Sequence, residues 1–165
     1  MGEIVQLLKI IDQAYDHRSW HGTNLRGSVR GVSFRQAAWR PAPRRHNIWE
    51  LVVHAAYWKY AVSRRFTGES RGSFPLKGSN WFSRPEVAGE KEWRSDVRLL
   101  DQMHRLLREC IRNLPPGELS RTPRGSKVSN EFILTGIAAH DLYHAGQIQL
   151  LKKLSTPPKR RSSDG

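Results

Sequence analysis

The chain has 165 residues, which is enough for one domain with a sizeable core but short for two. Its 28 Lys and Arg outnumber its 15 Asp and Glu, and the net charge of +13 would attract nucleic acid, an anionic membrane surface or acidic small molecules. No apolar run of transmembrane length and no secretory signal pattern occurs, and the single cysteine, Cys110, excludes an internal disulfide framework. We therefore expect a cytoplasmic protein without a membrane partner.

The basic residues are dispersed along the chain rather than arranged in a nucleic-acid-binding motif. Zinc-finger spacing, an RNP-like aromatic strand and a helix-turn-helix pattern are all missing from the sequence. Scattered arginines more often form a solvated surface than a nucleic-acid groove. The cluster from Lys159 to Arg161 follows two prolines, which predicts a disordered basic tail over residues 155–165 after a single domain over residues 1–154.

The first predicted helix runs from Glu3 to about Gly27, because apolar residues and one histidine recur on a single stripe. The members of this stripe are Leu7, Ile11, Ala14, His21 and Leu25. Gly27 and Gly31 weaken the pattern, and Ser33 is placed to cap a short turn that extends to Ala38.

The second predicted helix runs from Asn47, an N-cap residue with Glu50 in the capping-box position, to Phe66. Gly68 follows its end, as is typical of a helix C-terminus. The apolar residues of this helix cover more than one face, and such a helix is either buried or shares a face with a partner. The pattern predicts a homodimer.

The third predicted helix runs from Glu90 to Asn113, and its uninterrupted apolar seam includes His104. Residues 68–89 before it are rich in Gly, Ser and Pro, and a connection of this length is often functional. A second linker covers residues 119–129, and no segment has the period of a strand. Together with a last helix, these elements predict an all-α four-helix bundle with long irregular connections.

The last predicted helix, from Glu131 to Lys153, carries the main candidates for chemistry. Its inward stripe of isoleucines passes in phase through His140 and His144, which are four residues apart and therefore project side by side. Two adjacent imidazoles in an apolar core must be neutral and hydrogen-bonded, or they must share a cation, because burying unpaired charge is very costly.

A metal site needs a third protein ligand, and the helical pattern leaves three histidines in competition for that role. These are His21, His54 and His104, each on the inward stripe of its predicted helix. A lone histidine on an apolar face is more often a hydrogen-bonded core residue than a ligand, so at least two of the three should be structural.

The segment HDLYHAGQIQLLKKL, residues 140–154, resembles the signature of the DinB-like family of metal-dependent enzymes, also described as damage-inducible or YfiT-type. That signature is a helix with two histidines four apart, an aromatic residue before the second and Gly-Gln after it. The segment HNIWELVVHAAYWKYAV, residues 46–62, is similar to the family's other motif, a helix histidine that follows an H-x-I-W entry. The resemblance covers the first, second and last helices and implies a DinB-like four-helix bundle.

The resemblance also implies a metal site. By their match to the family's motifs, His54, His140 and His144 would hold one divalent ion and leave its remaining positions open to water or substrate. Zinc or nickel is the ion that the family implies, with iron, manganese or cobalt as alternatives. Imidazole suits zinc, nickel, copper and iron alike, so the sequence does not name the metal. His104 does not correspond to a ligand in the family.

Characterised relatives include thiol-dependent isomerases and S-transferases that use mycothiol, bacillithiol or glutathione. The resemblance therefore implies a metal-dependent transferase, isomerase or hydrolase-like enzyme with a small-molecule substrate and a low-molecular-weight thiol cosubstrate. Supporting roles fall to Gln147, which could orient a ligand, and to His21, which could shuttle protons. Asp141 lies where an H-E-x-x-H metalloprotease has its base, but it is one methylene shorter and off the histidine stripe, which argues against a protease.

A second class of function is left open by the composition. The protein could be a basic module that binds nucleic acid or a protein partner in a stress response, with a structural or vestigial metal site. The two classes differ in their salt dependence, because phosphate-driven binding weakens steeply with ionic strength, whereas metal-dependent turnover follows chelation.

Overall fold

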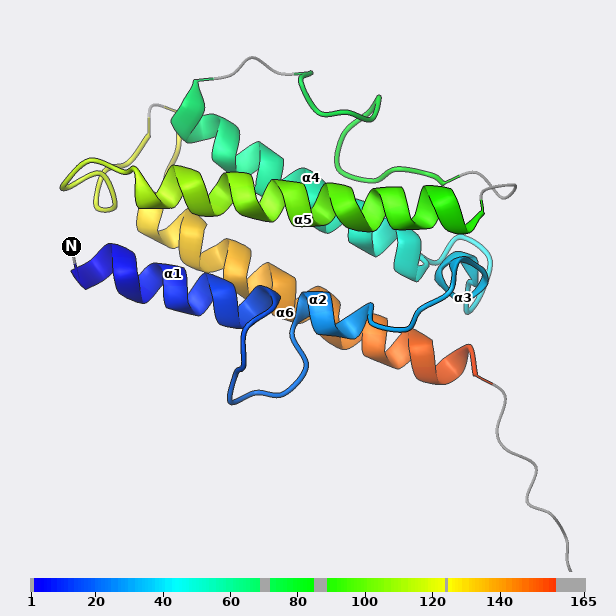
Figure 1. Cartoon of the computed structure of the whole chain (residues 1–165). Helices are drawn as coiled ribbons and strands as arrows, with labels where there is room; N and C mark the ends of the chain where they lie inside the picture. Colours follow the sequence, from blue (N-terminus) through cyan, green and yellow to red (C-terminus); the bar gives the residue numbers. More distant parts are fainter. Residues whose placement is uncertain (1, 69–71, 85–88, 124, 157–165) are drawn as a thin grey trace, which may run out of the picture.

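The computed structural model of the chain describes residues 2–68, 72–84, 89–123 and 125–156 (Figure 1). These residues form four longer helices, two short helices and no strand, so the all-α prediction is confirmed with six helices in place of four. The longer helices are α1 (Gly2–Tyr15), α4 (Ile48–Thr67), α5 (Glu90–Arg112) and α6 (Asn130–Leu154). The short helices are α2 (Leu25–Ser28) and α3 (Phe34–Ala38).

The predicted first helix is wrong beyond Tyr15. The chain leaves α1 there and adopts a left-handed conformation at Gly22, with φ of +98°, which a continuing α-helix cannot accommodate. Asn24 then begins α2: its side-chain oxygen accepts a hydrogen bond from the Gly27 N–H, and its amide nitrogen donates to the His17 carbonyl. The apolar stripe of the predicted helix continues past Tyr15 in its spacing, but capping by Asn24 begins a separate helix instead.

The limits of α3 and α4 follow from their caps as predicted. The side chains of Ser33 and Asn47 accept hydrogen bonds from backbone N–H groups in the first turns of α3 and α4, and Gly68 ends α4 with φ of +71°. Glu50 fills its expected capping-box role, because its carboxylate accepts a hydrogen bond from the Asn47 backbone N–H, and it also accepts hydrogen bonds from Arg40 and His46. The carboxylate thus joins the first turn of α4 to the segment before it.

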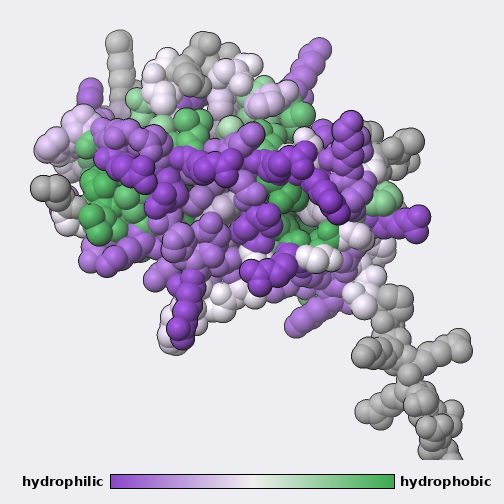
Figure 2. All heavy atoms as spheres, in the orientation of Figure 1, coloured by the Kyte–Doolittle hydropathy of each residue, from purple (hydrophilic) through white to green (hydrophobic). Residues whose placement is uncertain are grey.

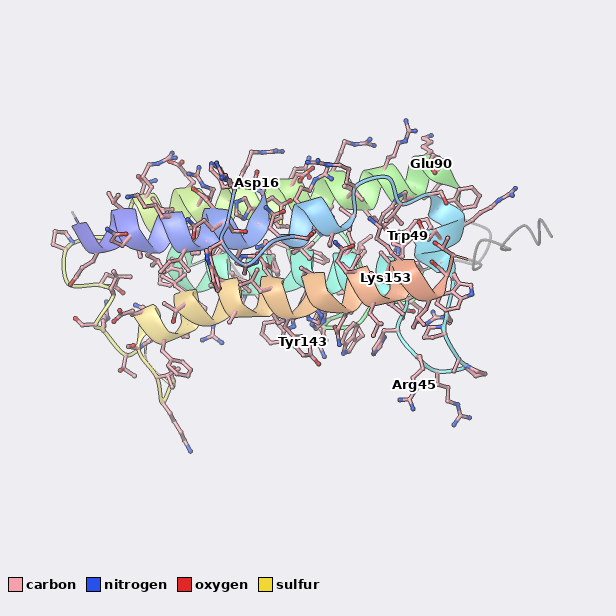
Figure 3. The ribbon with its side chains drawn as sticks, turned by 90° about the horizontal axis from the view of Figure 1, so that it is seen from below. Asp16, Arg45, Trp49, Glu90, Tyr143 and Lys153 are labelled. Atoms are coloured by element: carbon pink, nitrogen blue, oxygen red, sulfur yellow. The ribbon has the colours of Figure 1, made fainter. Side chains whose placement is uncertain are left out.

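Helix α4 packs against α5 and α6, and α1 packs along α6 and also against α5 (Figure 1). The core has two clusters: one lies around α4, and the other lies mainly between α1, α5 and α6. Trp49 of α4 is fully buried, and its indole N–H donates to Asp96 of α5 over 2.6 Å. In the view from below, Trp49 lies between the ribbons, while Tyr143 and Arg45 point away from them (Figure 3).

The connection between α4 and α5 covers the remaining face of α4. Phe74 and Phe82 of this connection are buried, and their rings pack against Tyr57 of α4 at centroid distances of 5.4 and 5.5 Å. The apolar character of α4 on more than one face is thus explained within one chain. The homodimer stays a prediction, without the argument that α4 needs a second copy.

Polar side chains cover most of the face in Figure 2, with hydrophobic groups visible between them. Within the part of the chain that the structure describes, no helix combines the length and the apolar character needed to cross a membrane. Helix α6 ends at Leu154, so the predicted tail begins where the helix stops. Most of that tail, residues 157–165, lies outside the described residues.

Candidate metal centre

The structure brings together three of the histidines that the sequence proposed as ligands. His54 projects from the middle of α4, and His140 and His144 project from adjacent turns of α6. The Nε2 atom of His140 lies 3.1 Å from Nε2 of His54 and 3.0 Å from Nε2 of His144. The candidate ligand atoms of the three rings all lie within 4.8 Å of one another, so they could hold a metal ion.

Two of the three rings are oriented by hydrogen bonds at their other nitrogen. Nδ1 of His54 donates to the backbone carbonyl of Asn80 over 2.9 Å, and Nδ1 of His144 donates to Oε1 of Gln147 over 2.7 Å. A neutral imidazole carries one N–H, so both rings present an unprotonated Nε2 to the centre of the cluster. Hydrogen bonds of this kind fix the tautomer and ring direction of metal-binding histidines.

Without a cation, the three converging Nε2 atoms leave one nitrogen lone pair without a hydrogen-bond donor. His140 can donate a single proton from Nε2, either to His54 or to His144, and the other Nε2 then faces it without a donor. Nδ1 of His140 is also buried and has no hydrogen-bond partner among the described residues. A cation at the centre would accept all three lone pairs, which no arrangement of one proton does.

The environment keeps the three imidazoles neutral near pH 7. Burial lowers the pKa of His54 to about 4, against the raising effect of its hydrogen bond to Asn80. Burial and the neighbouring histidines lower the pKa of His140 to about 3, and burial also lowers the pKa of His144. Neutral imidazole is the form that binds a metal.

An aromatic stack covers the His54 side of the cluster. The indole of Trp81 stacks on the His54 ring at 3.8 Å and 9°, and the His46 ring stacks on the opposite face of the indole at 3.6 Å and 9°. Asn80, next to Trp81, also accepts a hydrogen bond from the Trp58 indole over 3.0 Å. The connection between α4 and α5 thus both orients His54 and shields it.

The pattern of the sequence indicated a functional role for this connection but not for Asn80 or Trp81 individually. The only available signal was a tryptophan within a segment rich in Gly, Ser and Pro. Nothing in the spacing shows which loop carbonyl will face a helix histidine, because that depends on how the loop folds back over α4.

The other candidate residues are separated by the structure. Gln147 contacts His144 directly, through the hydrogen bond from Nδ1 of His144. His21 is exposed in the loop between α1 and α2, which corrects its expected place on an inward helix stripe. His104 is buried on α5 and stacks on Tyr15 of α1 at 3.7 Å, as a core residue. Cys110 lies half-buried on α5, a helix that contributes no histidine to the cluster.

Asp141 is fully buried and points away from the histidines toward Lys59 of α4, with which it forms an ion pair. Burial raises the pKa of Asp141 to about 6, against the lowering influence of the Lys59 ammonium. Lys59 also lies 4.9 Å from the centre of the Tyr15 ring. The carboxylate therefore ties α6 to α4 and is not placed as a base beside the histidine cluster, which a metalloprotease would require.

Sequence reasoning missed Lys59, although a signal was present. A lysine in the middle of a helix that is apolar nearly all round must find a buried partner, because an unpaired buried ammonium is too costly. Lys59 follows Trp58 on α4, and Asp141 follows His140 on α6. The pair thus joins the two helices that carry the histidines. It therefore helps to set the spacing across the cluster.

A groove of about 890 Å³ reaches the cluster from the side. It lies between α4, α6 and the connection between α5 and α6, and we call it the α4–α6 groove. Trp58 and His140 belong to its lining, so a molecule in the groove can approach the centre of the cluster past His140.

Comparison with known proteins gives one informative result. A family model described as the DinB superfamily matches residues 17–148, which include all three histidines of the cluster and the whole of α4 and α5. No curated protein and no solved structure matches the chain.

Proposed function

The chain belongs to the DinB superfamily, and from this premise we propose that His54, His140 and His144 hold one divalent metal ion. The observation that carries the proposal is the convergence of three Nε2 atoms, two of them fixed as acceptors by Asn80 and Gln147. Family membership and the three-histidine cluster together fit a metal-binding protein.

The dimensions of the cluster fit such an ion. Zinc–nitrogen bonds of about 2.0–2.1 Å in tetrahedral geometry separate neighbouring nitrogens by about 3.3–3.4 Å. The Nε2 atom of His140 lies 3.1 and 3.0 Å from its two neighbours, so His140 needs to part from each of them by only a few tenths of an ångström. The candidate ligand atoms of all three rings lie within 4.8 Å of one another. We expect zinc or nickel, both of which imidazole ligands suit, with iron, manganese or cobalt as alternatives.

We further propose that the site serves a metal-dependent enzyme of the transferase, isomerase or hydrolase-like kind, with a low-molecular-weight thiol as cosubstrate. Three neutral ligands would leave a bound divalent ion its full charge and an open position, which can lower the pKa of a thiol and polarise a carbonyl. Mycothiol, bacillithiol and glutathione are the candidate thiols. The chain's own residues orient His54 and His144 through Asn80 and Gln147, and Trp81 shields His54 from solvent.

The test is the metal content of the purified, tag-free protein, measured by elemental analysis. We expect one zinc or nickel per chain in the wild type and a loss of that metal in His54→Ala and in His144→Ala. His21→Ala is the matched control, because His21 is an exposed histidine outside the cluster, and it should retain the metal. A wild type that neither contains a metal nor takes up added zinc or nickel would refute the proposal.

The alternative is a basic module that binds nucleic acid or a protein partner, and the observation that favours it is the net charge of +13. It predicts nucleic-acid binding that weakens steeply between low and moderate salt and is indifferent to chelators. A cytoplasmic location and a homodimer belong to this proposal and to the first equally.

A further inference from the structure

The α4–α6 groove has two chemically different ends. One end contains Trp58 and His140, beside the histidine cluster. The other end contains Arg64 and Arg65, in the last turn of α4, and Arg121 of the connection between α5 and α6. The groove therefore leads from the proposed metal to a group of arginines.

The arginine end carries a net positive charge. Arg121 lies 3.3 Å from the Glu118 carboxylate, which also accepts a hydrogen bond from Asn130. Arg64 and Arg65 have no ion-pair partner among the described residues of the chain. Among the described residues that line this end, three arginines thus accompany one carboxylate, and a ligand with an anionic group would complement their charge.

The middle of the groove is apolar and open. Val62 and Phe66 of α4 and Ile133 and Ile137 of α6 belong to its lining. Gly136 of α6 lies between these isoleucines, and a Cβ atom added to it would meet nothing within 4 Å. The open space above Gly136 leaves room for a ligand body to lie against the helix.

The spacing along the helices sets the length of the ligand. Trp58 at the cluster end and Arg65 at the other end are seven residues apart on α4, which corresponds to about 10 Å along the helix axis. A ligand that fills the groove would have its metal-binding group and its anion separated by this distance.

We propose that the α4–α6 groove binds an elongated anionic small molecule, with its carboxylate or phosphate at Arg64, Arg65 and Arg121, its apolar segment over Gly136, and its reactive end beside His140. This inference rests on the proposed metal centre for the identity of the reactive end. The arginine end and the apolar middle stand on the groove alone.

The test uses ω-mercaptoalkanoates as probes on the zinc-loaded protein, by isothermal titration calorimetry. Mercaptooctanoate has a thiol for the metal, an apolar chain that spans the groove and a carboxylate for the arginines. Mercaptoacetate is too short to reach them, and mercaptooctanol has no anion. We expect mercaptooctanoate to bind roughly tenfold or more tightly than either, since a charge-assisted hydrogen bond at a partly exposed site contributes a factor of this order.

Substitutions in the groove test which residues contribute to the binding of mercaptooctanoate. Arg64→Gln, Arg65→Gln and Arg121→Gln should each weaken mercaptooctanoate by about threefold to tenfold and leave mercaptoacetate unchanged. Gly136→Leu should weaken it by more than about tenfold, because the side chain fills the groove, and it should retain the metal and the helix. Arg98→Gln, at an exposed arginine of α5, is the control and should change nothing. Equal binding of mercaptooctanoate and mercaptooctanol, or an unaffected Gly136→Leu variant, would overturn the proposal.

The failure of the metal centre can be told apart from the failure of the groove. Octanoate and octanol are compared on the metal-free His144→Ala variant, in which only the arginine end and the apolar middle can act. Tighter binding of octanoate, lost on the addition of Gly136→Leu, supports the groove even if no metal binds. Equal binding of octanoate and octanol there would refute the arginine end whether or not the wild type contains zinc.

Discussion

The ion pair between Lys59 and Asp141 should be the most sensitive point of the bundle to a single substitution. The side chains of Lys59 and Asp141 are 0% and 1% exposed, so removal of either partner leaves a charge in the core. We expect Asp141→Asn and Lys59→Met each to lower the free energy of unfolding at pH 7 by about 3–5 kcal/mol. That is a large part of the stability of a domain of this size.

The loss of stability in each variant is limited, because the buried group that has lost its partner can become neutral by releasing or taking up a proton. At pH 7, deprotonating a lysine costs about 4.6 kcal/mol and protonating an aspartate costs about 4.2 kcal/mol, from the reference pKa values of the free side chains. Near pH 9 the first cost falls to about 1.9 kcal/mol, and near pH 5 the second falls to about 1.5 kcal/mol. Asp141→Asn should therefore gain relative stability as pH rises, because a lone buried lysine releases its proton more easily. Lys59→Met should gain relative stability as pH falls.

The assay is urea unfolding of the wild type, both single variants and the double variant at about pH 5, 7 and 9. The double variant Lys59→Met/Asp141→Asn has neither charge and is the reference for the pH comparison. It should be more stable at pH 7 than either single variant, because an unpaired buried amide costs only about 1–3 kcal/mol. Glu109→Gln, in an exposed pair with Arg112, is the control and should cost no more than about 1 kcal/mol.

Two outcomes would refute this reasoning. One is a single variant within about 1 kcal/mol of the wild type, because a stranded buried charge cannot be that cheap. The other is the same pH response in both single variants, since the two stranded groups titrate in opposite directions. Where a single variant does not fold at pH 7, recovery of folding in the double variant is itself the predicted result.

Substitutions at three further positions test the surroundings of the cluster. Gln147→Leu removes the acceptor of the hydrogen bond from the His144 Nδ1–H. It should weaken zinc binding by about 10- to 100-fold, measured by competition with a chelator. An unchanged affinity would show that Gln147 does not orient the His144 ring. Trp81→Ala should speed zinc release to a chelator by about twofold to tenfold, because the alanine removes the ring that stacks on His54. Trp81→Phe keeps an aromatic ring and should not speed release. Equal release rates for the two variants would contradict this role of Trp81. Burial raises the pKa of Glu50, but hydrogen bonds from Arg40 and His46 outweigh the effect of burial, so the pKa is lowered overall. Ionised Glu50 therefore stabilises the fold at pH values above its pKa in the unfolded chain. This contribution is lost as pH falls through its pKa in the folded protein. Glu50→Gln should therefore cost about 1–3 kcal/mol at pH 7 and much less near pH 3 in urea unfolding, and an equal cost at both pH values would argue against the ion pair.

The features that depend on local spacing were predictable from the sequence. The limits of α5 and α6 differ from the predicted limits by one residue at most, because an apolar repeat and a stop such as Pro115 act within a few turns. The side-by-side placement of His140 and His144 follows from the helical repeat in the same way. The caps at Ser33 and Asn47 are equally local.

The extent of α1 shows where local pattern misleads. The stripe through His21 and Leu25 continued the spacing of α1, but the chain turns at Gly22 and Asn24 starts a separate helix. Leu25 is buried all the same, from α2 rather than from α1. A burial pattern alone therefore does not reveal that a helix has been broken and the chain redirected between two of its apolar positions.

The third histidine could be selected only by resemblance to a family, because His21, His54 and His104 had equivalent patterns. The choice depends on the rotation and axial shift of α4 against α6, which the helical repeat of neither helix contains. These are fixed by contacts between distant residues, among them the Lys59–Asp141 pair. The same holds for Asn80 and Trp81, whose approach to His54 requires the loop to fold back over α4. The sequence by itself determined the helices and two adjacent imidazoles, and the tertiary structure decided which groups surround them, because helical periodicity is a local property and packing between helices is not.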